Sequence, residues 1–286
     1  MAQRKRKPAR GATGVDPRNK LNELTNKQWM IETKSVWFST PPPRDRLKAD
    51  HPATFAEADV ERLIRFFTKK GGCVLDPFLG TGSTLIAALN AGRGGLGIEL
   101  SEHWADVARK RLAPWTDSLL PLPAEVEVRT GDARKILPRL KRDSCDFVVT
   151  SPPYWTILRK RADHKVKRER LAKGLRTRYS DSDDDLGNLP SYEAFLKELG
   201  KVFRSCYRVL KPGRYLAVLA SDFRDGSRFH LFHADIARIC EKAGYTLEGI
   251  TILAQDSKNL YPYGVPYRFV SNVNHQNIVI LRKPDL

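Results

Sequence analysis

The chain has 286 residues, 41% of them hydrophobic and 29% charged, which is the composition of a folded protein with a sizeable core and excludes a disordered one. No run approaches the roughly 18 apolar residues of a membrane span, and no apolar segment follows the basic amino terminus, so we expect a soluble, cytoplasmic protein with no membrane partner. The formal net charge of +17 indicates a polyanionic partner such as nucleic acid.

The four cysteines and six histidines form no metal-binding pattern. The cysteines are scattered through apolar surroundings without paired spacing, so we expect reduced thiols in the core. His230 and His233 could share one face of a helix, but no third ligand accompanies them. The sequence therefore predicts no metal.

In chain order, residues 1–20 are rich in Lys, Arg, Gly and Pro and predict a flexible basic arm, while residues 21–286 predict a single domain. A short strand after residue 34 and a proline-rich loop precede an amphipathic helix that begins near Ala56 and ends at Gly71. Strands are then expected at 73–77, 95–99, 124–130, 145–151, 214–221, 246–254 and 276–283. Helices are expected at 81–92, 102–112, 133–140, 190–210 and 233–244.

This alternation of strands and helices is typical of an α/β fold. It predicts a Rossmann-like, mostly parallel sheet with helices on both faces, in which the last two strands form an antiparallel C-terminal hairpin.

The turn DPFLGTGST, residues 76–84, joins a strand to a helix, and its glycines let the backbone approach a ligand at the helix N-terminus. Glu99 ends the next strand, at about the 20-residue offset where an acid meets ribose hydroxyls, and Asp132 follows the strand after that. Leu85 replaces the third glycine of a dinucleotide fingerprint, and no P-loop is present. Each acid alone could be a helix cap or a surface group, but three at successive strand ends favour a nucleoside ligand. With Asp76 beside an ammonium group, S-adenosylmethionine fits best.

The segment TSPPYW, residues 150–155, follows the fourth expected strand and should face the glycine turn across one cleft. Its prolines remove backbone donors and leave carbonyl acceptors in that cleft. Ser151 and the Pro152 carbonyl could grip an amino group while Tyr154 stacks on a planar ring. A base removed from its helix meets those needs.

These motifs resemble those of the amino-directed DNA methyltransferases, which methylate cytosine N4 or adenine N6, and in particular their Ser-Pro-Pro-Tyr subgroup. The matching segments are DPFLGTGST, GIE, TSPPYW and the ADHPATF segment at 49–55, with LKPG at 210–213 a less specific one. The resemblance covers residues 34–283. It implies an S-adenosylmethionine-dependent fold and duplex DNA with a flipped base as substrate.

The resemblance also implies roles for individual residues. The implied cofactor-binding residues are Asp76, Phe78, Gly80, Gly82, Ser83, Thr84, Glu99, Asp132, Thr54 and Thr150, with Lys34 or Ser35 near the methionine carboxylate. The implied catalytic residues are Ser151, Pro152, Pro153 and Tyr154, with Trp155 as a further wall. The serine form of the tetrapeptide is commoner among cytosine-N4 enzymes, so cytosine is favoured and adenine N6 is the alternative.

The target-recognition region is harder to locate, because the catalytic tetrapeptide follows the cofactor turn here, whereas this glycine turn resembles members with the reverse order. Two segments are candidates for DNA contact: the basic insertion 156–188 and the aromatic segment 256–276. The alternatives are a solvated charged surface and a packed aromatic loop. The expected DNA-binding residues are Arg159, Lys160, Arg161, Lys165, Lys167, Arg168, Arg170, Tyr261, Tyr263 and Arg268.

Other functions remain open. An RNA base methyltransferase usually has Asn or Asp before the Pro-Pro-Tyr and an added RNA-binding domain, a protein-glutamine methyltransferase has Asn there, and a non-catalytic nucleic-acid-binding protein could keep the same fold. A DNA enzyme would associate with the nucleoid. Its recognition sequence, its state as monomer or homodimer and any accompanying restriction enzyme are not determined by these patterns.

Overall fold

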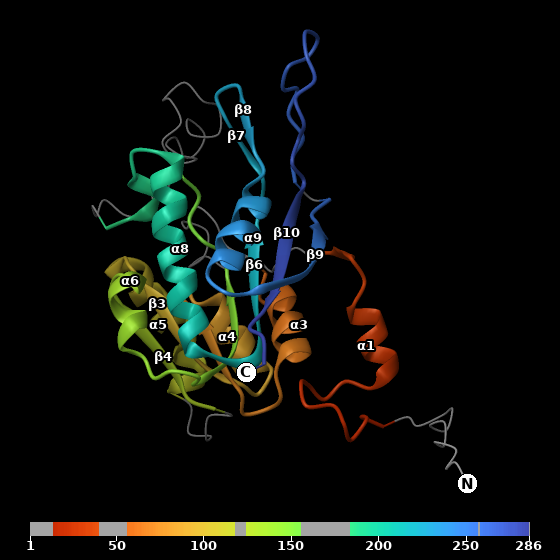
Figure 1. The fold of residues 1–286 in the computed structure, drawn as a ribbon, viewed down its shortest axis with the longest axis vertical. Coiled ribbons are helices and arrows are strands. Elements are labelled where there is room, and N and C mark those ends of the chain that lie inside the picture. Colours follow the sequence, from red (N-terminus) through yellow and green to blue (C-terminus); the bar gives the residue numbers. More distant parts are fainter. Residues whose placement is uncertain (1–13, 40–55, 118–123, 156–183, 257, 286) are drawn as a thin grey trace.

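The computed structural model describes residues 14–39, 56–117, 124–155, 184–256 and 258–285. An eight-stranded sheet of order β1-β9-β10-β6-β5-β2-β3-β4 forms its centre (Figure 1). Its strands are β1 Val36–Phe38, β2 Cys73–Asp76, β3 Gly94–Glu99, β4 Val126–Thr130, β5 Cys145–Thr150, β6 Leu210–Ala220, β9 Thr246–Ala254 and β10 His275–Arg282. The helices are α1 Asn26–Glu32, α3 Glu57–Phe67, α4 Ser83–Asn90, α5 Glu102–Thr116, α6 Ala133–Ile136, α8 Tyr192–Val209 and α9 Phe232–Lys242. Two short 3-10 helices are η1 Leu137–Arg139 and η3 Leu186–Asn188.

The strand directions place almost every strand end at one edge of the sheet. β2, β3, β4, β5 and β6 pair in parallel, whereas β10 runs antiparallel to both β6 and β9. β1 pairs in parallel with β9. Only β10 therefore runs against the others, and the carboxyl ends of the remaining strands share one edge. This confirms the predicted mostly parallel sheet with an antiparallel C-terminal hairpin.

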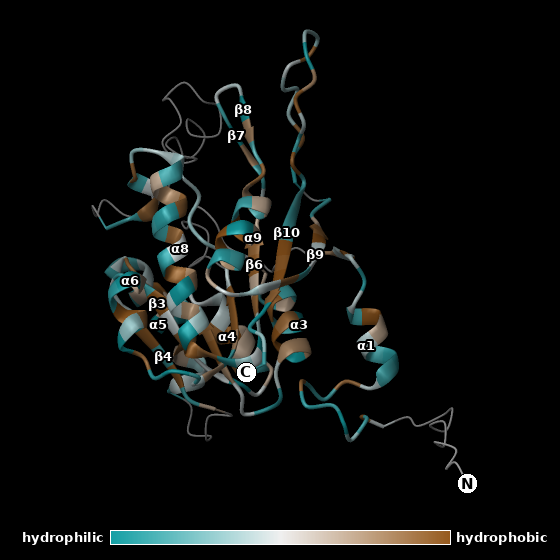
Figure 2. Cartoon of the chain, in the orientation of Figure 1, coloured by the Kyte–Doolittle hydropathy of each residue, from teal (hydrophilic) through white to brown (hydrophobic). Residues whose placement is uncertain are grey.

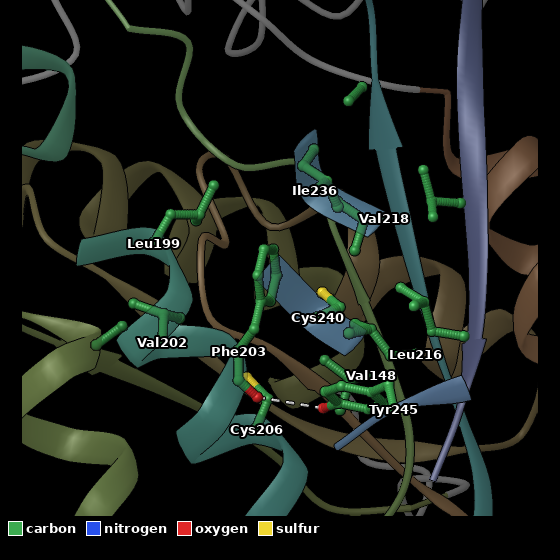
Figure 3. Close-up of a cluster of buried hydrophobic side chains, with 14 of the residues drawn as sticks. Val148, Leu199, Val202, Phe203, Cys206, Leu216, Val218, Ile236, Cys240 and Tyr245 are labelled. Carbon is green, nitrogen blue, oxygen red and sulfur yellow. Dashed lines mark hydrogen bonds between the residues drawn. The ribbon is translucent and has the colours of Figure 1, made fainter. Parts of the chain in front are cut away.

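Helices cover both faces of the sheet because the central strands are apolar on both sides (Figure 2). On β5, Phe147 and Val149 belong to the core shared with α3 and α4, whereas Val148 belongs to the core shared with α8 and α9. Figure 3 shows the second core, where Phe203 of α8 lies near Tyr245, whose hydroxyl donates to the Phe203 carbonyl at 3.3 Å. Leu79, Leu85 and Leu112 are among the residues of a third cluster, which joins α4 to α5.

Two pairs of elements were not predicted. Helix α1 buries none of its residues completely, and the two-stranded hairpin of β7 (Phe223–Asp225) and β8 (Arg228–His230) has strands too short for a periodic pattern. The expected boundary at LKPG is confirmed, since α8 ends at Val209, but Leu210 already begins β6.

The segment before α1 is attached to the domain. The Asn22 side-chain amide donates to the Phe66 carbonyl at 2.6 Å, and the buried Arg93 guanidinium pairs with Glu23 at 3.0 Å. Arg93 also donates to Thr68 at the end of α3. The first 13 residues of the expected basic arm lie outside the described residues.

Membrane and metal features were searched in the same ranges. No helix described there is long and apolar enough to cross a membrane, and no cluster of three His, Cys, Asp or Glu side chains that could hold a metal occurs there. All four cysteines are free thiols, and three are buried.

Replacing Phe147 by alanine tests the core of the central strand. Phe147 is fully buried and stacks on Phe67, with ring centroids 5.0 Å apart. The cavity left by Phe147→Ala should lower the free energy of unfolding by about 3–5 kcal/mol, measured by urea denaturation. Phe269→Ala is the matched control, because Phe269 is 91% exposed and its loss should change the stability by less than about 0.5 kcal/mol. Equal effects of the two substitutions would contradict the described packing.

Candidate active site

A cavity opens at the carboxyl edge of the sheet, at the ends of β2, β3, β4 and β5. Eight of the predicted site residues line it: Phe78, Gly80, Ser83, Glu99, Asp132, Ser151, Pro152 and Pro153. The glycine turn and the Ser-Pro-Pro loop therefore face one cavity, as their positions after parallel strands predict.

The glycine turn is held in a shape that only glycine accommodates easily. Gly80 and Gly82 have φ angles of 56° and 88°, and a Cβ atom on Gly82 would lie 3.1 Å from the Cβ of Ala108 in α5. Helix α4 starts immediately afterwards at Ser83, so its first amide groups lie at the cavity.

A salt bridge that the sequence did not indicate supports this turn. Arg111 of α5 pairs with Glu57 of α3 at 2.6 Å and donates to the Thr81 carbonyl at 2.5 Å, while the Ser83 hydroxyl donates to Glu57 at 2.9 Å. Three helices are thus tied to the same turn. The separation of 54 residues between Glu57 and Arg111 leaves no local pattern by which to find the pair.

Asp76 lies behind the cavity rather than in its wall. Its side chain is fully buried and accepts hydrogen bonds from the Thr84 hydroxyl at 2.5 Å, the Thr150 hydroxyl at 2.6 Å and the Phe78 amide at 3.0 Å. Burial raises the pKa of Asp76 to about 6 against the opposing effect of these donors. The expected contact of Asp76 with an ammonium group is not part of this arrangement; instead Asp76 joins β2, α4 and β5.

Glu99 is the acid that borders the cavity from β3. Its carboxylate accepts from the Gly80 amide at 2.8 Å and the Ser101 amide at 2.9 Å. Burial raises the pKa of Glu99 to about 7, although both amides favour the ionised form. A hydroxyl pair of a ribose could donate to this carboxylate, which is the role expected for Glu99.

Asp132 also lines the cavity, but its carboxylate already has partners. It caps α6 through the Arg134 amide at 2.8 Å and pairs with the Arg134 guanidinium at 2.9 Å. Arg134 in turn contacts Asp184, which lines the cavity together with Asp185. These two aspartates end the acidic run after the basic insertion. That run was visible in the sequence, but nothing in the pattern placed it at the cavity.

The catalytic loop presents its first three residues to the cavity and packs the rest against the protein. Among the described residues, the Ser151 hydroxyl has no hydrogen-bond partner. The Tyr154 hydroxyl accepts from the Ser221 amide at 2.9 Å, and its ring lies edge-on to Phe223 with centroids 6.2 Å apart. Trp155 donates to the Leu189 carbonyl at 2.9 Å and packs on Tyr192, so it supports the loop from behind rather than forming a further cavity wall.

The other predicted residues are not brought to the cavity. Thr84, Gly82, Thr150 and Tyr154 lie beside it without lining it. Lys34 and Ser35 precede β1, at the opposite edge of the sheet. Thr54 and the basic residues of 159–170 lie outside the described residues. Tyr261, Tyr263 and Arg268 lie in the connection between β9 and β10, away from the cavity lining.

The sheet order, the glycine turn and the acid at the end of the next strand define a Rossmann-like methyltransferase fold. Comparison with known proteins agrees. A family model for N6 and N4 amino-methyltransferases, described as DNA methylase, matches residues 2–110 and 145–278. The chain therefore belongs to this family of DNA methylases.

Individual relatives match shorter stretches. The type II methyltransferase M.BglI of Bacillus subtilis is 35% identical over 102 residues, 36% of this chain and 28% of that relative. The type II methyltransferase M2.DpnII of Streptococcus pneumoniae is 34% identical over 93 residues, 32% of this chain and 34% of that relative. The chain thus matches only about a third of the length of these curated relatives.

A solved structure shows the same fold. The S-adenosylmethionine-dependent methyltransferase of Methanosarcina mazei superposes with a TM-score of 0.50 over 78% of this chain and 98% of that chain, at 14% identity. S-adenosylmethionine is the methyl donor of this family and fold. The residues present fit it, because the cavity combines the glycine turn, the start of α4 and the buried carboxylate of Glu99.

The raised pKa of Glu99 predicts how stability depends on pH. A carboxyl group whose folded pKa of about 7 exceeds its unfolded value of 4.5 stabilises the fold below pH 4.5, and this contribution is lost as the pH rises to about 7. Between pH 5 and pH 8, Glu99→Gln should therefore gain stability relative to the unaltered protein, by about 3 kcal/mol over the full range. Urea denaturation at the two pH values measures this.

Glu127→Gln is the control for this measurement, since Glu127 is an exposed acid of β4 paired with Arg129. Its stability should follow that of the unaltered protein at both pH values. If Glu99→Gln follows it as well, the burial assigned to Glu99 is wrong.

Proposed function

We propose that the protein is an S-adenosylmethionine-dependent DNA methyltransferase that methylates the exocyclic amino group of a flipped base, with cytosine N4 as the favoured target. The observation that carries this proposal is the Ser151–Pro153 loop, which forms one wall of the cavity whose other walls are the glycine turn and Glu99. Adenine N6 is the alternative target, since the family covers both.

The loop offers acceptors for an amino group. The Ser151 oxygen and the Pro152 carbonyl are placed at the cavity, and neither proline contributes a backbone donor. Two hydrogen bonds from a base amino group to these oxygens would favour a pyramidal nitrogen, whose lone pair is then no longer delocalised into the ring. The bound cofactor supplies an electrophilic methyl group, and the reaction follows from positioning the two reactants in line.

Tyr154 would complete the base site. Its hydroxyl bond to Ser221 and its contacts with Phe223 and Phe232 fix the ring at the end of the loop. A rigid aromatic ring at this place supports stacking on an extruded base, which must be held without its neighbours in the helix. A carbon-5 cytosine methyltransferase would need a cysteine at the loop; the nearest, Cys145, lies at the other end of β5.

DNA as the substrate is supported by family membership and by the net charge of +17. We include the basic segment 159–170 and the residues Tyr261, Tyr263 and Arg268 among the proposed DNA contacts. Such an enzyme would act in the cytoplasm at the nucleoid, as a member of a restriction-modification system or alone.

The product identifies the function directly. Purified protein is incubated with S-adenosylmethionine and mixed-sequence duplex DNA, and the nucleosides of the digest are identified by mass spectrometry. We expect N4-methylcytosine. N6-methyladenine would retain the mechanism and replace the base, whereas methylation of RNA but not of DNA, or of neither, would refute the proposal.

Ser151→Ala tests the loop itself. Removal of one acceptor from the amino group should lower the rate of methyl transfer by about 10²-fold, while cofactor affinity stays within about threefold, because Ser151 is assigned to the base rather than to the donor. Single-turnover transfer and calorimetric cofactor titration measure the two quantities.

Ser144→Ala provides the matched control, since Ser144 precedes the same strand β5 and only contacts the Lys141 carbonyl. Its transfer rate should equal that of the unaltered enzyme. Full activity of Ser151→Ala would remove Ser151 from the catalytic set.

A further inference from the structure

The connection between β9 and β10 is a long arm whose apolar tip is exposed. We define the arm as residues 255–274, of which 257 lies outside the described residues. It extends away from the body of the molecule beyond the ends of both strands (Figure 1). Its most exposed apolar side chains are Leu260 at 71%, Val265 at 68%, and Tyr267 and Phe269 at 91% each. Such a concentration at one tip indicates a binding surface, whereas single exposed apolar residues are ordinary.

The arm is a closed ribbon held by its own hydrogen bonds. Gln255 donates to the Asn274 carbonyl at 2.9 Å at its root. Further out, the Asn272 side chain accepts from the Tyr261 amide at 3.0 Å and donates to the Tyr261 carbonyl at 2.8 Å. At the tip, the Gly264 carbonyl accepts from the Tyr267 and Arg268 amides at 2.7 and 2.8 Å. The exposed rings are therefore presented by a shape that exists before any partner binds.

The arm leaves the same edge of the sheet as the cavity. β9 runs parallel to β5, so the carboxyl end of β9 at Ala254 lies at the edge that carries the Ser-Pro-Pro loop. β10 and β6 separate these two strands, which corresponds to about 14 Å at the usual spacing of strands. With half of its residues running outward, the arm can reach up to about 30 Å.

These dimensions match DNA held with one base in the cavity. The major groove admits a two-stranded ribbon, and about 14 Å along a duplex corresponds to about four base pairs. The charge is also suitable, because the arm contains Lys258 and Arg268 against the single acid Asp256. Arg268 stands between the two exposed rings and has no acidic partner in the part of the chain that the structure describes. The neighbouring hairpin β7–β8 adds Arg224 and Arg228.

We propose that the arm is the target-recognition element of the enzyme, and that it enters the major groove beside the flipped base with Tyr267 and Phe269 against the bases. The inference rests on the proposed function for its substrate. It assigns to Tyr267 and Phe269 a share in choosing the methylated sequence, and to Arg268 a contact with phosphate or a base edge.

The test compares the unaltered full-length protein with the double variant Tyr267→Ala, Phe269→Ala. Affinity for a labelled duplex that carries a methylated site is measured by fluorescence anisotropy at several salt concentrations. We expect binding to weaken at least about tenfold, since each aromatic contact with a base contributes on that scale. The slope of log affinity against log salt should not change, because no phosphate contact is lost. The preference among methylated sites, read by sequencing, should decrease.

Met30→Ala is the control, because Met30 is 74% exposed on α1, outside the arm. It should match the unaltered protein in affinity and site preference, and all variants should keep the same cofactor affinity. Unchanged DNA affinity and site preference in the double variant would overturn the proposal. So would a loss of dimer mass in light scattering with unchanged DNA binding, since the arm would then join two copies of the chain.

The binding experiment separates this inference from the proposed function. If the unaltered protein binds duplex DNA but transfers no methyl group, the proposed function fails, and the inference is still judged by the effect of the double variant on affinity. If the unaltered protein binds no duplex DNA, both are overturned.

Discussion

The buried carboxyl group of Asp76 is the interaction on which the site depends. Its two oxygens hold Thr84 at the start of α4 and Thr150 at the end of β5, so one side chain connects the glycine turn to the residue before the catalytic loop. A carboxyl group without exposure to water is tolerated only because three donors surround it. The distance between the cofactor side and the base side of the cavity is therefore set inside the core rather than at the surface.

Much of the fold could be predicted because the central strands are short apolar runs separated by helices with clear periodicity. Phe147, Val148 and Val149 illustrate the pattern, since consecutive residues must pack against different helix layers. Helix α1 escaped prediction because it lacks a buried stripe, and the β7–β8 hairpin because three-residue strands that contain Arg and Asp carry no alternation. The sheet order was also beyond the sequence, because the pairing of β1 with β9 joins residues more than 200 positions apart.

The site was predictable where residues follow strand ends and unpredictable where they act through space. Glu99 and Ser151 were found because parallel strands bring their ends together. Asp76 was assigned to the wall of the cavity, yet it lies one layer deeper, because a pattern does not distinguish a side chain that contacts a ligand from one that supports it. Glu57 and Arg111 were missed because their salt bridge joins helices distant in sequence.

The root of the arm has an evolutionary consequence. His275 pairs with Ala254 in the register of β10 and β9, and the paired residues continue from there to Arg282. Residues inserted into or deleted from the connection leave this register unchanged, because both strand ends are fixed by the sheet. The length and composition of the arm can thus diversify without disturbing β5 or the cavity, so that a lineage can exchange its contacts with a partner while its chemistry is conserved.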